Sequence, residues 1–271
     1  MPELPEVETV KNGLIKKVKN KKITKCNILY EGIIAYPKKE EFIKNIKNQT
    51  INDIKRRGKF LMFVLDDYYL ISHLRMEGKY FIKNHEEELN KHDHVVFTLD
   101  TGEELRYNDT RKFGKMHLVK KDELEKTPII KLGLEPWDES LTTEYLKNKL
   151  NKKKAIKTLL LDQSIITGIG NIYADEILFL SNINPKIEGN KLTNKNLQDI
   201  IDNTRKVLEK AISLGGTTIH TYTAVDGITG RFQQKLLVHG KKDELCPNCK
   251  TKIIKIVVNT RGTYYCPNCQ K

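Results

Sequence analysis

The sequence predicts an α+β protein. We expect an amino-terminal antiparallel β-sandwich domain with a flanking helix, then a helical domain, then a small metal-binding β-hairpin. Three observations support this: short apolar runs separated by turn residues between about 22 and 120, an apolar period of three and four beyond 133, and two C-x-x-C pairs in the last 26 residues. A chain of 271 residues can form two domains and a small third module. The predicted boundaries are 1–133, 134–235 and 236–271.

A short amphipathic helix should open the chain. Within residues 1–16, Leu4, Val7, Val10 and Leu14 recur at intervals of three or four. Pro5 suits the first turn of a helix, because the amide hydrogen that proline lacks has no partner there.

Short strands should follow, with turn residues such as Asp66-Asp67 and Asp100-Thr101-Gly102 between them. The apolar runs are Phe60–Leu65, Tyr69–Leu74, Val95–Leu99, Leu105–Tyr107 and Gly114–Val119. Runs of this length favour a sandwich or a barrel. We expect Cys26 to be a half-buried strand residue.

The second half should be helical after a linker at Leu132–Glu139. A helical apolar stripe is formed by Leu197, Ile200, Ile201, Thr204, Val207, Leu208, Ala211 and Ile212. Thr193 or Asn194 can cap its start, and Gly215-Gly216 can end it. Residues 215–235 have no period, which is typical of a functional or disordered loop.

The charge indicates a polyanionic partner. The formal net charge is +13 and the sequence pI is about 9.3, which favours nucleic acid first and an anionic membrane surface second. The alternative explanation is a biased nucleotide composition of the genome, which the excess of Lys over Arg and the abundance of Asn favour. No apolar run approaches the roughly 20 residues that a membrane span needs. The acidic start MPELPEVET is unlike a secretory signal, so we expect a cytoplasmic protein.

Four cysteines form a metal-binding pattern. Cys246, Cys249, Cys266 and Cys269 make two C-x-x-C knuckles with 16 residues between them, which predicts one closed, structural S4 zinc site. A redox dithiol is the alternative, and two matched pairs argue against it. Ile253–Val258 and Thr263–Tyr265 should form a hairpin whose tip, Asn259–Gly262, carries Arg261.

The amino terminus has the residues for amine catalysis. Removal of Met1 would make Pro2 a terminal secondary amine with a pKa near 8, able to attack a sugar C1′ and form an iminium ion. Glu3 and Glu6 lie alongside and could transfer protons. The alternative is that both carboxylates only favour the helix dipole.

Seven segments together resemble one family. They are PELPEVET (2–9), RRGKF (56–60), HLRMEGK (73–79), KHDHV (91–95), DTRKFG (109–114), GIGNIYADE (168–176) and the cysteine pattern. The chain resembles the formamidopyrimidine-DNA glycosylases, bacterial repair enzymes for oxidised purines, from Pro2 to Lys271. The resemblance implies a helix–two-turns–helix element around Gly168–Leu180 and DNA bound between the domains.

The resemblance also implies residue roles. Pro2 is the expected nucleophile, Glu3 the proton donor that opens the deoxyribose ring, Lys59 the lysine of β-elimination and Arg261 the finger-tip arginine of δ-elimination and phosphate contact. His73 and Asn171 are expected to bind phosphates, and His92, Arg111 and Lys152 to make further DNA contacts. Met76, Arg111 and Phe113 are expected to fill the hole left by a flipped nucleotide. The damaged base is expected to be bound by Glu6, Glu77 and the 217–232 loop. Apart from the resemblance, the lysine run 152–154 and Lys157 could follow the DNA backbone. The alternative is a solvated helix face, and we do not count Lys153 or Lys154 among the contacts.

We therefore expect a monomeric, zinc-containing bifunctional DNA glycosylase and abasic-site lyase that works in base excision repair on the bacterial nucleoid. A flipped 8-oxoguanine or formamidopyrimidine would be excised, and β,δ-elimination would leave a one-nucleotide gap. One alternative is an endonuclease VIII-like enzyme for oxidised pyrimidines, which Leu4, Arg111 and Phe113 disfavour. The other is a non-catalytic zinc-ribbon DNA-binding protein, which does not explain Pro2, Glu3 and Lys59 together.

Overall fold

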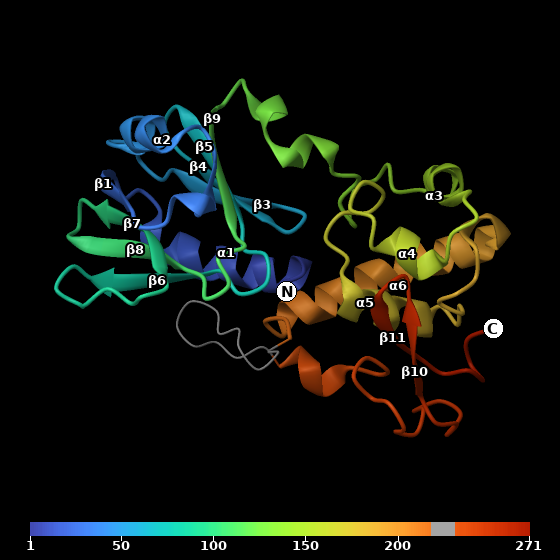
Figure 1. Ribbon diagram of the computed structural model, residues 1–271. Coiled ribbons are helices and arrows are strands. Elements are labelled where there is room, and N and C mark those ends of the chain that lie inside the picture. The colour runs from blue at the N-terminus through green and yellow to red at the C-terminus, as the bar shows by residue number, and fades with distance from the viewer. Residues whose placement is uncertain (218–230) are drawn as a thin grey trace. The chain divides into compact units, whose positions relative to one another are not determined.

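The computed structural model describes residues 1–217 and 231–271 and divides into two compact units (Figure 1). The first contains residues 1–130 and the segment that begins at Gly215, and the second contains residues 131–214 and 231–271. Within the described residues, no helix combines the length and apolarity that a membrane span requires.

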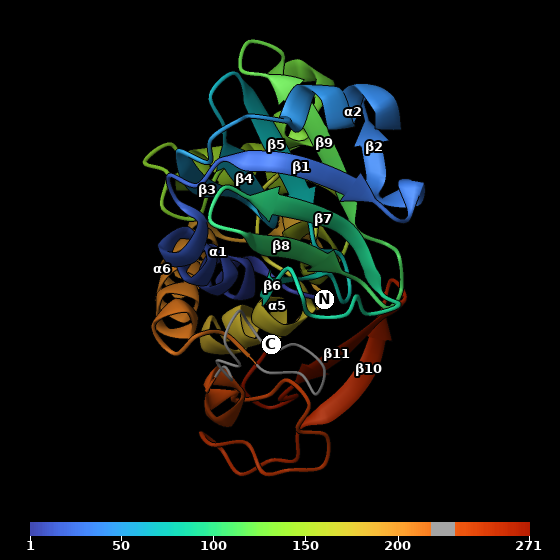
Figure 2. The same ribbon diagram turned by 90° about the vertical axis from the view of Figure 1, so that its left-hand side faces the viewer.

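The first unit is a sandwich of two sheets (Figure 2). One sheet has the order β1 (Ile23–Ile28), β7 (Asp93–Leu99), β8 (Glu103–Asn108), β6 (Lys79–Asn84). The other has the order β2 (Ile34–Tyr36), β9 (Lys115–Lys120), β5 (Tyr68–His73), β4 (Phe60–Val64), β3 (Asp53–Arg57). The strand pairs are antiparallel except β2–β9, which is parallel. The predicted sandwich is confirmed, with this one parallel edge added.

Aromatic side chains join the inner faces of the two sheets. The ring centroid of Phe63 on β4 lies 5.5 Å from that of Tyr80 on β6, which lies 5.2 Å from that of Tyr107 on β8. The buried Tyr80 hydroxyl donates to Ser72 Oγ at 2.8 Å, so its polar end has a partner inside the core. Cys26 on β1 is buried in the same core, deeper than the half-burial we expected.

The predicted amino-terminal helix is confirmed as α1 (Leu4–Val18), with Leu4, Val7, Val10, Leu14 and Val18 buried along one side. It packs against β3 and β4. A second helix, α2 (Lys39–Ile46), was not predicted, because its eight residues bury only Phe42 and Ile46 and give too short an apolar pattern to recognise.

The second unit contains helices α3 (Thr143–Leu150), α4 (Ile156–Leu160), α5 (Asn171–Leu180) and α6 (Asn194–Ser213). The predicted long helix is confirmed as α6, and Thr193 caps it by accepting from the Asn196 amide. Both α3 and α5 pack against α6. Short 3-10 turns lie at Glu31–Ile33 and Leu124–Lys126 in the first unit, at Pro128–Lys131 where the chain passes from the first unit to the second, and at Gly189–Lys191 and Phe232–Lys235 in the second unit.

The carboxy-terminal hairpin pairs β10 (Ile254–Val258) with β11 (Arg261–Tyr265). Its turn has only two residues, Asn259 and Thr260, both with positive φ, at 45° and 66°. This is the tight turn whose twist suits a hairpin, so the ladder closes at Val258–Arg261. β11 therefore begins two residues earlier than the predicted Thr263.

Candidate functional site

Both oxygens of the Glu6 carboxylate are engaged at the amino terminus. Oε2 accepts from the Glu3 amide at 2.8 Å, while Oε1 accepts from the Thr217 amide at 2.7 Å and the Thr217 hydroxyl at 3.0 Å. Gly216, with φ of 77°, passes so close that a Cβ there would lie 2.7 Å from Glu6 Oε1. Glu6 therefore joins the start of α1 to the segment that ends at Thr217. Residues 218–230, which make up most of the predicted 217–232 loop, lie outside the described residues.

Pro2 and Glu3 are buried immediately before α1. Met1 precedes Pro2 in the chain, so the Pro2 nitrogen is an amide here. It becomes a secondary amine only when Met1 is removed.

Lys59 lies in the β3–β4 turn, and its side chain is buried. Arg56 braces this turn: its Nη1 donates to the Gly58 carbonyl at 3.0 Å and its Nε to Glu8 Oε2 of α1 at 2.7 Å. Burial disfavours the Glu8 charge, but hydrogen bonds from Lys11 and Arg56 outweigh it, so the pKa of Glu8 is lowered. This ion pair fixes the Lys59 turn against the helix that follows Pro2.

His73 at the end of β5 is buried, and its Nδ1 accepts from the Arg75 amide at 2.9 Å. Burial, followed by the positive charges of Arg75 and Lys59, lowers the pKa of His73 to about 3. The ring is therefore neutral at physiological pH, and Nε2 carries the hydrogen. It can act as a neutral donor to a phosphate, not as a cation.

Two large apolar side chains of the first unit are exposed, Met76 (38%) and Phe113 (49%). The Arg111 guanidinium lies 4.7 Å from the Phe113 ring centroid, in a cation–π contact. Glu77 accepts a hydrogen bond from Thr110, which connects the segment of Met76 to that of Arg111. An arginine, a methionine and a phenylalanine that point to solvent are suited to contact an unstacked base.

In the second unit, Gly170 caps α5 and Asn171 is its first residue. The turn before it is braced by Gln163, which accepts from the Gly168 amide at 2.9 Å and donates to the Ile169 carbonyl at 2.8 Å. Gly168 has φ of 95°, where a side chain would be strained. A glycine turn that opens a helix is an arrangement suited to a phosphate.

The hairpin is tied to this turn. Asn171 Nδ2 donates to the Gly262 carbonyl at 3.0 Å, and Lys157 Nζ donates to the same oxygen at 3.1 Å. Arg261, the neighbour of Gly262, is exposed at the start of β11. The exposed arginine and the start of α5 are thereby held together within one unit.

Lys157 is not a surface lysine, and our expectation that it follows the DNA backbone is wrong. Its side chain is fully buried, with Nζ 2.5 Å from Asp175 Oδ1. Asp175 also interacts through Oδ2 with His239 Nδ1 at 2.7 Å and accepts from the Tyr264 amide at 3.2 Å. An ammonium group without water needs such a counter-charge. Lys152, Lys153 and Lys154 are exposed, as a backbone contact requires.

The cysteine cluster fits zinc. The four Sγ atoms of Cys246, Cys249, Cys266 and Cys269 lie within 4.8 Å of one another, with Cys246–Cys269 at 3.8 Å and Cys249–Cys266 at 3.4 Å. A tetrahedral ion with Zn–S bonds of 2.3 Å requires sulfur atoms about 3.8 Å apart. The protein therefore has a four-cysteine site for one structural zinc ion, with no open ligand position for catalysis.

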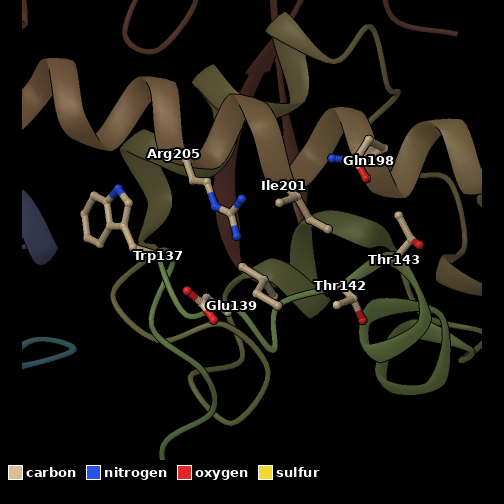
Figure 3. A pocket seen from close by; sticks show the side chains of 8 residues that line it. Trp137, Glu139, Thr142, Thr143, Gln198, Ile201 and Arg205 are labelled. Atoms are coloured by element: carbon tan, nitrogen blue, oxygen red, sulfur yellow. The ribbon is translucent and has the colours of Figure 1, made fainter.

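The groove shown in Figure 3 holds none of these residues. It lies in the second unit between the linker and α6, has a volume of about 540 Å³ and includes Trp137 and Arg205 in its lining (Figure 3). Arg205 donates to the Pro136 and Asp138 carbonyls, and Trp137 Nε1 donates to Glu209. These contacts fasten the linker onto α6, which is a structural role.

The structure thus groups the predicted residues by unit. The first unit holds Pro2, Glu3, Glu6, Lys59, His73, Met76, Glu77, His92, Arg111 and Phe113. The second unit holds Lys152, Asn171, Arg261 and the four cysteines of the zinc site. Sequence reasoning missed Asp175 and Glu176 as anchors. Burial raises the pKa of Glu176, although its carboxylate accepts from the amides of residues 237, 238 and 239. Two acidic residues in an otherwise apolar helix were the available signal.

Comparisons with known proteins agree along the whole chain. The family models for the formamidopyrimidine-DNA glycosylase N-terminal domain, its H2TH domain and the zinc finger found in FPG and IleRS match residues 1–116, 132–223 and 239–271. The formamidopyrimidine-DNA glycosylases of Bacillus subtilis and Shouchella clausii are each 48% identical over 273 residues, which cover 100% of this chain and 99% of theirs.

Solved structures are similarly close. A Lactococcus lactis FPG variant in complex with Fapy-dG-containing DNA matches with a TM-score of 0.94 and 41% identity over 100% of both chains. The L. lactis FPG complex with abasic-site DNA has a TM-score of 0.93 and 41% identity over 99% of both chains. The wild-type L. lactis complex with an oxidised-pyrimidine DNA has a TM-score of 0.92 and 40% identity over 100% of both chains. The chain therefore belongs to the formamidopyrimidine-DNA glycosylase family, whose members are DNA glycosylases.

Proposed function

We propose that this enzyme is a bifunctional DNA glycosylase and abasic-site lyase that excises 8-oxoguanine and formamidopyrimidines from duplex DNA. The proposal is carried by one observation: family membership extends over the full chain, and the residues for amine catalysis stand at its start. The relatives solved with Fapy-dG and abasic-site DNA support the same substrate class.

In the first chemical step, the amine of Pro2, free after Met1 removal, attacks C1′ of the flipped nucleotide. The bond from C1′ to the base breaks, and the base leaves with the electron pair and a proton. Glu3 gives a proton to O4′ as the sugar ring opens, which yields an iminium ion between Pro2 and C1′.

The iminium then acts as an electron sink. Loss of a proton from C2′ breaks the C3′–O bond and releases the 3′ phosphate, with Lys59 assigned to this β-elimination. Loss of a proton from C4′ then breaks the C5′–O bond, with Arg261 assigned to the δ-elimination. A one-nucleotide gap with phosphates at both ends remains.

The other residues would bind DNA. His73, His92, Lys152 and Asn171 would contact the backbone, Glu6 and Glu77 would serve the damaged base, and Met76, Arg111 and Phe113 would enter the space that the flipped nucleotide leaves. Extrusion costs a few kcal/mol, which such side chains can offset by restoring stacking. We propose domains at 1–133, 134–235 and 236–271, and a monomeric cytoplasmic enzyme that acts on the nucleoid.

Reductive trapping tests the chemistry. Borohydride should fix the enzyme covalently to an 8-oxoguanine duplex, and mass spectrometry should place the adduct on Pro2. Pro2→Gly, or a chain that retains Met1, should lose base excision. Pro5→Ala is the matched control, because it alters a buried proline of the same segment and leaves the terminal amine in place. An adduct on a lysine would refute Pro2 as the nucleophile, and the absence of any adduct would refute the iminium mechanism.

A second substrate class is supported by the L. lactis complex with oxidised-pyrimidine DNA. Excision from 8-oxoguanine·C and thymine-glycol duplexes should therefore be compared under single-turnover conditions. We expect faster excision of 8-oxoguanine. The opposite order would favour the endonuclease VIII-like alternative.

A further inference from the structure

The segment between β8 and β9 places charged and aromatic side chains in solvent around a buried acid. Arg111, Lys112 and Phe113 are exposed, whereas Asp109 has no exposed surface. A carboxylate is almost never fully buried unless its oxygens are paired. The partners of Asp109 therefore indicate what it does.

The Asp109 carboxylate accepts hydrogen bonds from the backbone of the exposed residues themselves. Oδ1 accepts from the Arg111 amide at 3.0 Å, and Oδ2 accepts from the amides of Phe113 at 3.0 Å and Gly114 at 2.8 Å. The Tyr107 hydroxyl lies 3.4 Å from Oδ2. One side chain thus fixes the path of the chain on both sides of Lys112.

The backbone of Asp109 is fixed as well. Its amide donates to the His92 carbonyl at 3.0 Å, and its carbonyl contacts His94 Nε2 at 2.8 Å and accepts from the Lys112 amide at 3.2 Å. The neighbouring Thr110 donates to Glu77. Asp109 and Thr110 therefore join the segments that carry His92, Glu77 and the exposed pair of Arg111 and Phe113.

The turn leaves little freedom for another path. Lys112 has φ of 56°, and a Cβ at Gly114 would lie 1.7 Å from the Tyr107 hydroxyl and 3.2 Å from Asp109 Oδ2. An exposed phenylalanine gains from folding back onto the protein. The three hydrogen bonds from backbone amides to the Asp109 carboxylate hold the backbone and oppose this folding back. Phe113 therefore stays 49% exposed, with the Arg111 guanidinium over its ring.

We infer that Asp109 is a positioning residue that holds Arg111 and Phe113 ready for insertion into the duplex. The inference rests on the proposed function, in which these two side chains enter the space left by the flipped nucleotide. Ordering a backbone segment on binding costs conformational entropy, so a segment that is ordered before binding spares the complex that cost. Asp109 itself need not touch DNA.

Asp109→Asn tests this with little change of shape. The amide can keep one oxygen, but its NH₂ group faces a backbone N–H that also donates, so at least one bond is lost and replaced by repulsion. We would measure Kd for a duplex with a tetrahydrofuran abasic-site analogue, in wild type and in an Arg111→Ala/Phe113→Ala background. Asp109→Asn should weaken binding about tenfold in the wild type and less than about twofold in the double variant. Fluorescence of 2-aminopurine beside the lesion reports base unstacking. Asp109→Asn should reduce this signal in the wild-type background and leave it unchanged in the Arg111→Ala/Phe113→Ala background.

Asp93→Asn is the matched control, because Asp93 is also a buried carboxylate and accepts from the Asn90 amide and the Asn108 side chain. Its effect on Kd should be equal in the two backgrounds. Should Asp109→Asn fail to fold, Asp109→Ser keeps one acceptor oxygen and is measured in the same cycle.

Two results would overturn the inference, and they are distinguishable. If Asp109→Asn weakens binding equally in both backgrounds, Asp109 has only a general structural role, and the proposed function stands. If Arg111→Ala/Phe113→Ala binds the lesion duplex as tightly as wild type, the insertion role in the proposed function is wrong, and nothing remains for Asp109 to position.

Discussion

The imidazole of His73 lies against the Phe60 ring, at 4.5 Å between centroids, and accepts from the Arg75 amide. Because the pKa of His73 is lowered from 6.5 to about 3, chiefly by burial, the unfolded chain binds a proton between these pH values that the folded protein does not. The unfolding free energy should therefore fall as the pH drops through this window, by up to about 1.4 kcal/mol per pH unit from this group.

His73→Gln should make that pH dependence shallower, since glutamine does not titrate. Chemical denaturation at several pH values between 4 and 7 measures the slope. We further expect that the contribution of His73 to DNA affinity, taken as the ratio of wild-type to variant Kd, is constant from pH 5.5 to 8. A ratio that grows toward acid pH would mean that His73 binds phosphate as a cation, contrary to its buried environment.

At the scale of elements, the buried pair of Lys157 on α4 and Asp175 on α5 joins the helices to β11, where Lys157 donates to Gly262 and Asp175 accepts from Tyr264. Asp175→Asn removes the counter-charge and leaves an ammonium group in the interior, at an expected cost of about 3–5 kcal/mol in unfolding free energy. Lys157→Met/Asp175→Leu removes both charges and should cost much less.

Denaturation curves of the single and double variants measure this difference, and limited proteolysis near residues 259–262 reports whether the hairpin has come loose. Asp199→Asn is the control, because Asp199 forms an exposed pair with Lys195 on α6 at 2.6 Å, and such pairs contribute below about 1 kcal/mol. A single variant at Asp175 that is as stable as the double variant would show that the pair is not what anchors the hairpin.

These elements also show how far the sequence could predict the structure. α6 and the cysteine knuckles were predictable because their signal is a local repeat or a fixed spacing. The partners of Lys157 and Asp109 were not predictable. Those of Lys157 lie 18 and 105 positions away in the chain, and those of Asp109 are backbone amides, which carry no sequence signal. Leu160, which lies one helical turn after Lys157 and is buried, was a local sign that this lysine points inward. Likewise the residue types of the DTRKFG segment predicted exposed contacts, but the acid that holds them leaves no periodic pattern.

For the whole molecule, the net charge of +13 sets the long-range attraction to DNA, while individual exposed lysines set how many phosphates are neutralised. Lys152 lies in the exposed stretch 151–154 that precedes α4. If it contacts a phosphate, Lys152→Ala releases one counterion fewer, and the slope of log K against log salt should decrease in magnitude by about one. The affinity should fall for every duplex sequence alike, with or without a lesion.

Titrations of an undamaged and a lesion duplex between about 50 and 200 mM salt measure this slope. Lys195→Ala removes the same formal charge from the same unit, but this lysine is paired with Asp199 on the exposed side of α6. If the salt slope depends only on net charge, it should change equally in both variants. If Lys152 contacts a phosphate, the magnitude of the slope should decrease for Lys152→Ala alone. Equal slopes for the two variants would therefore leave Lys152 as part of the general field, with no phosphate of its own.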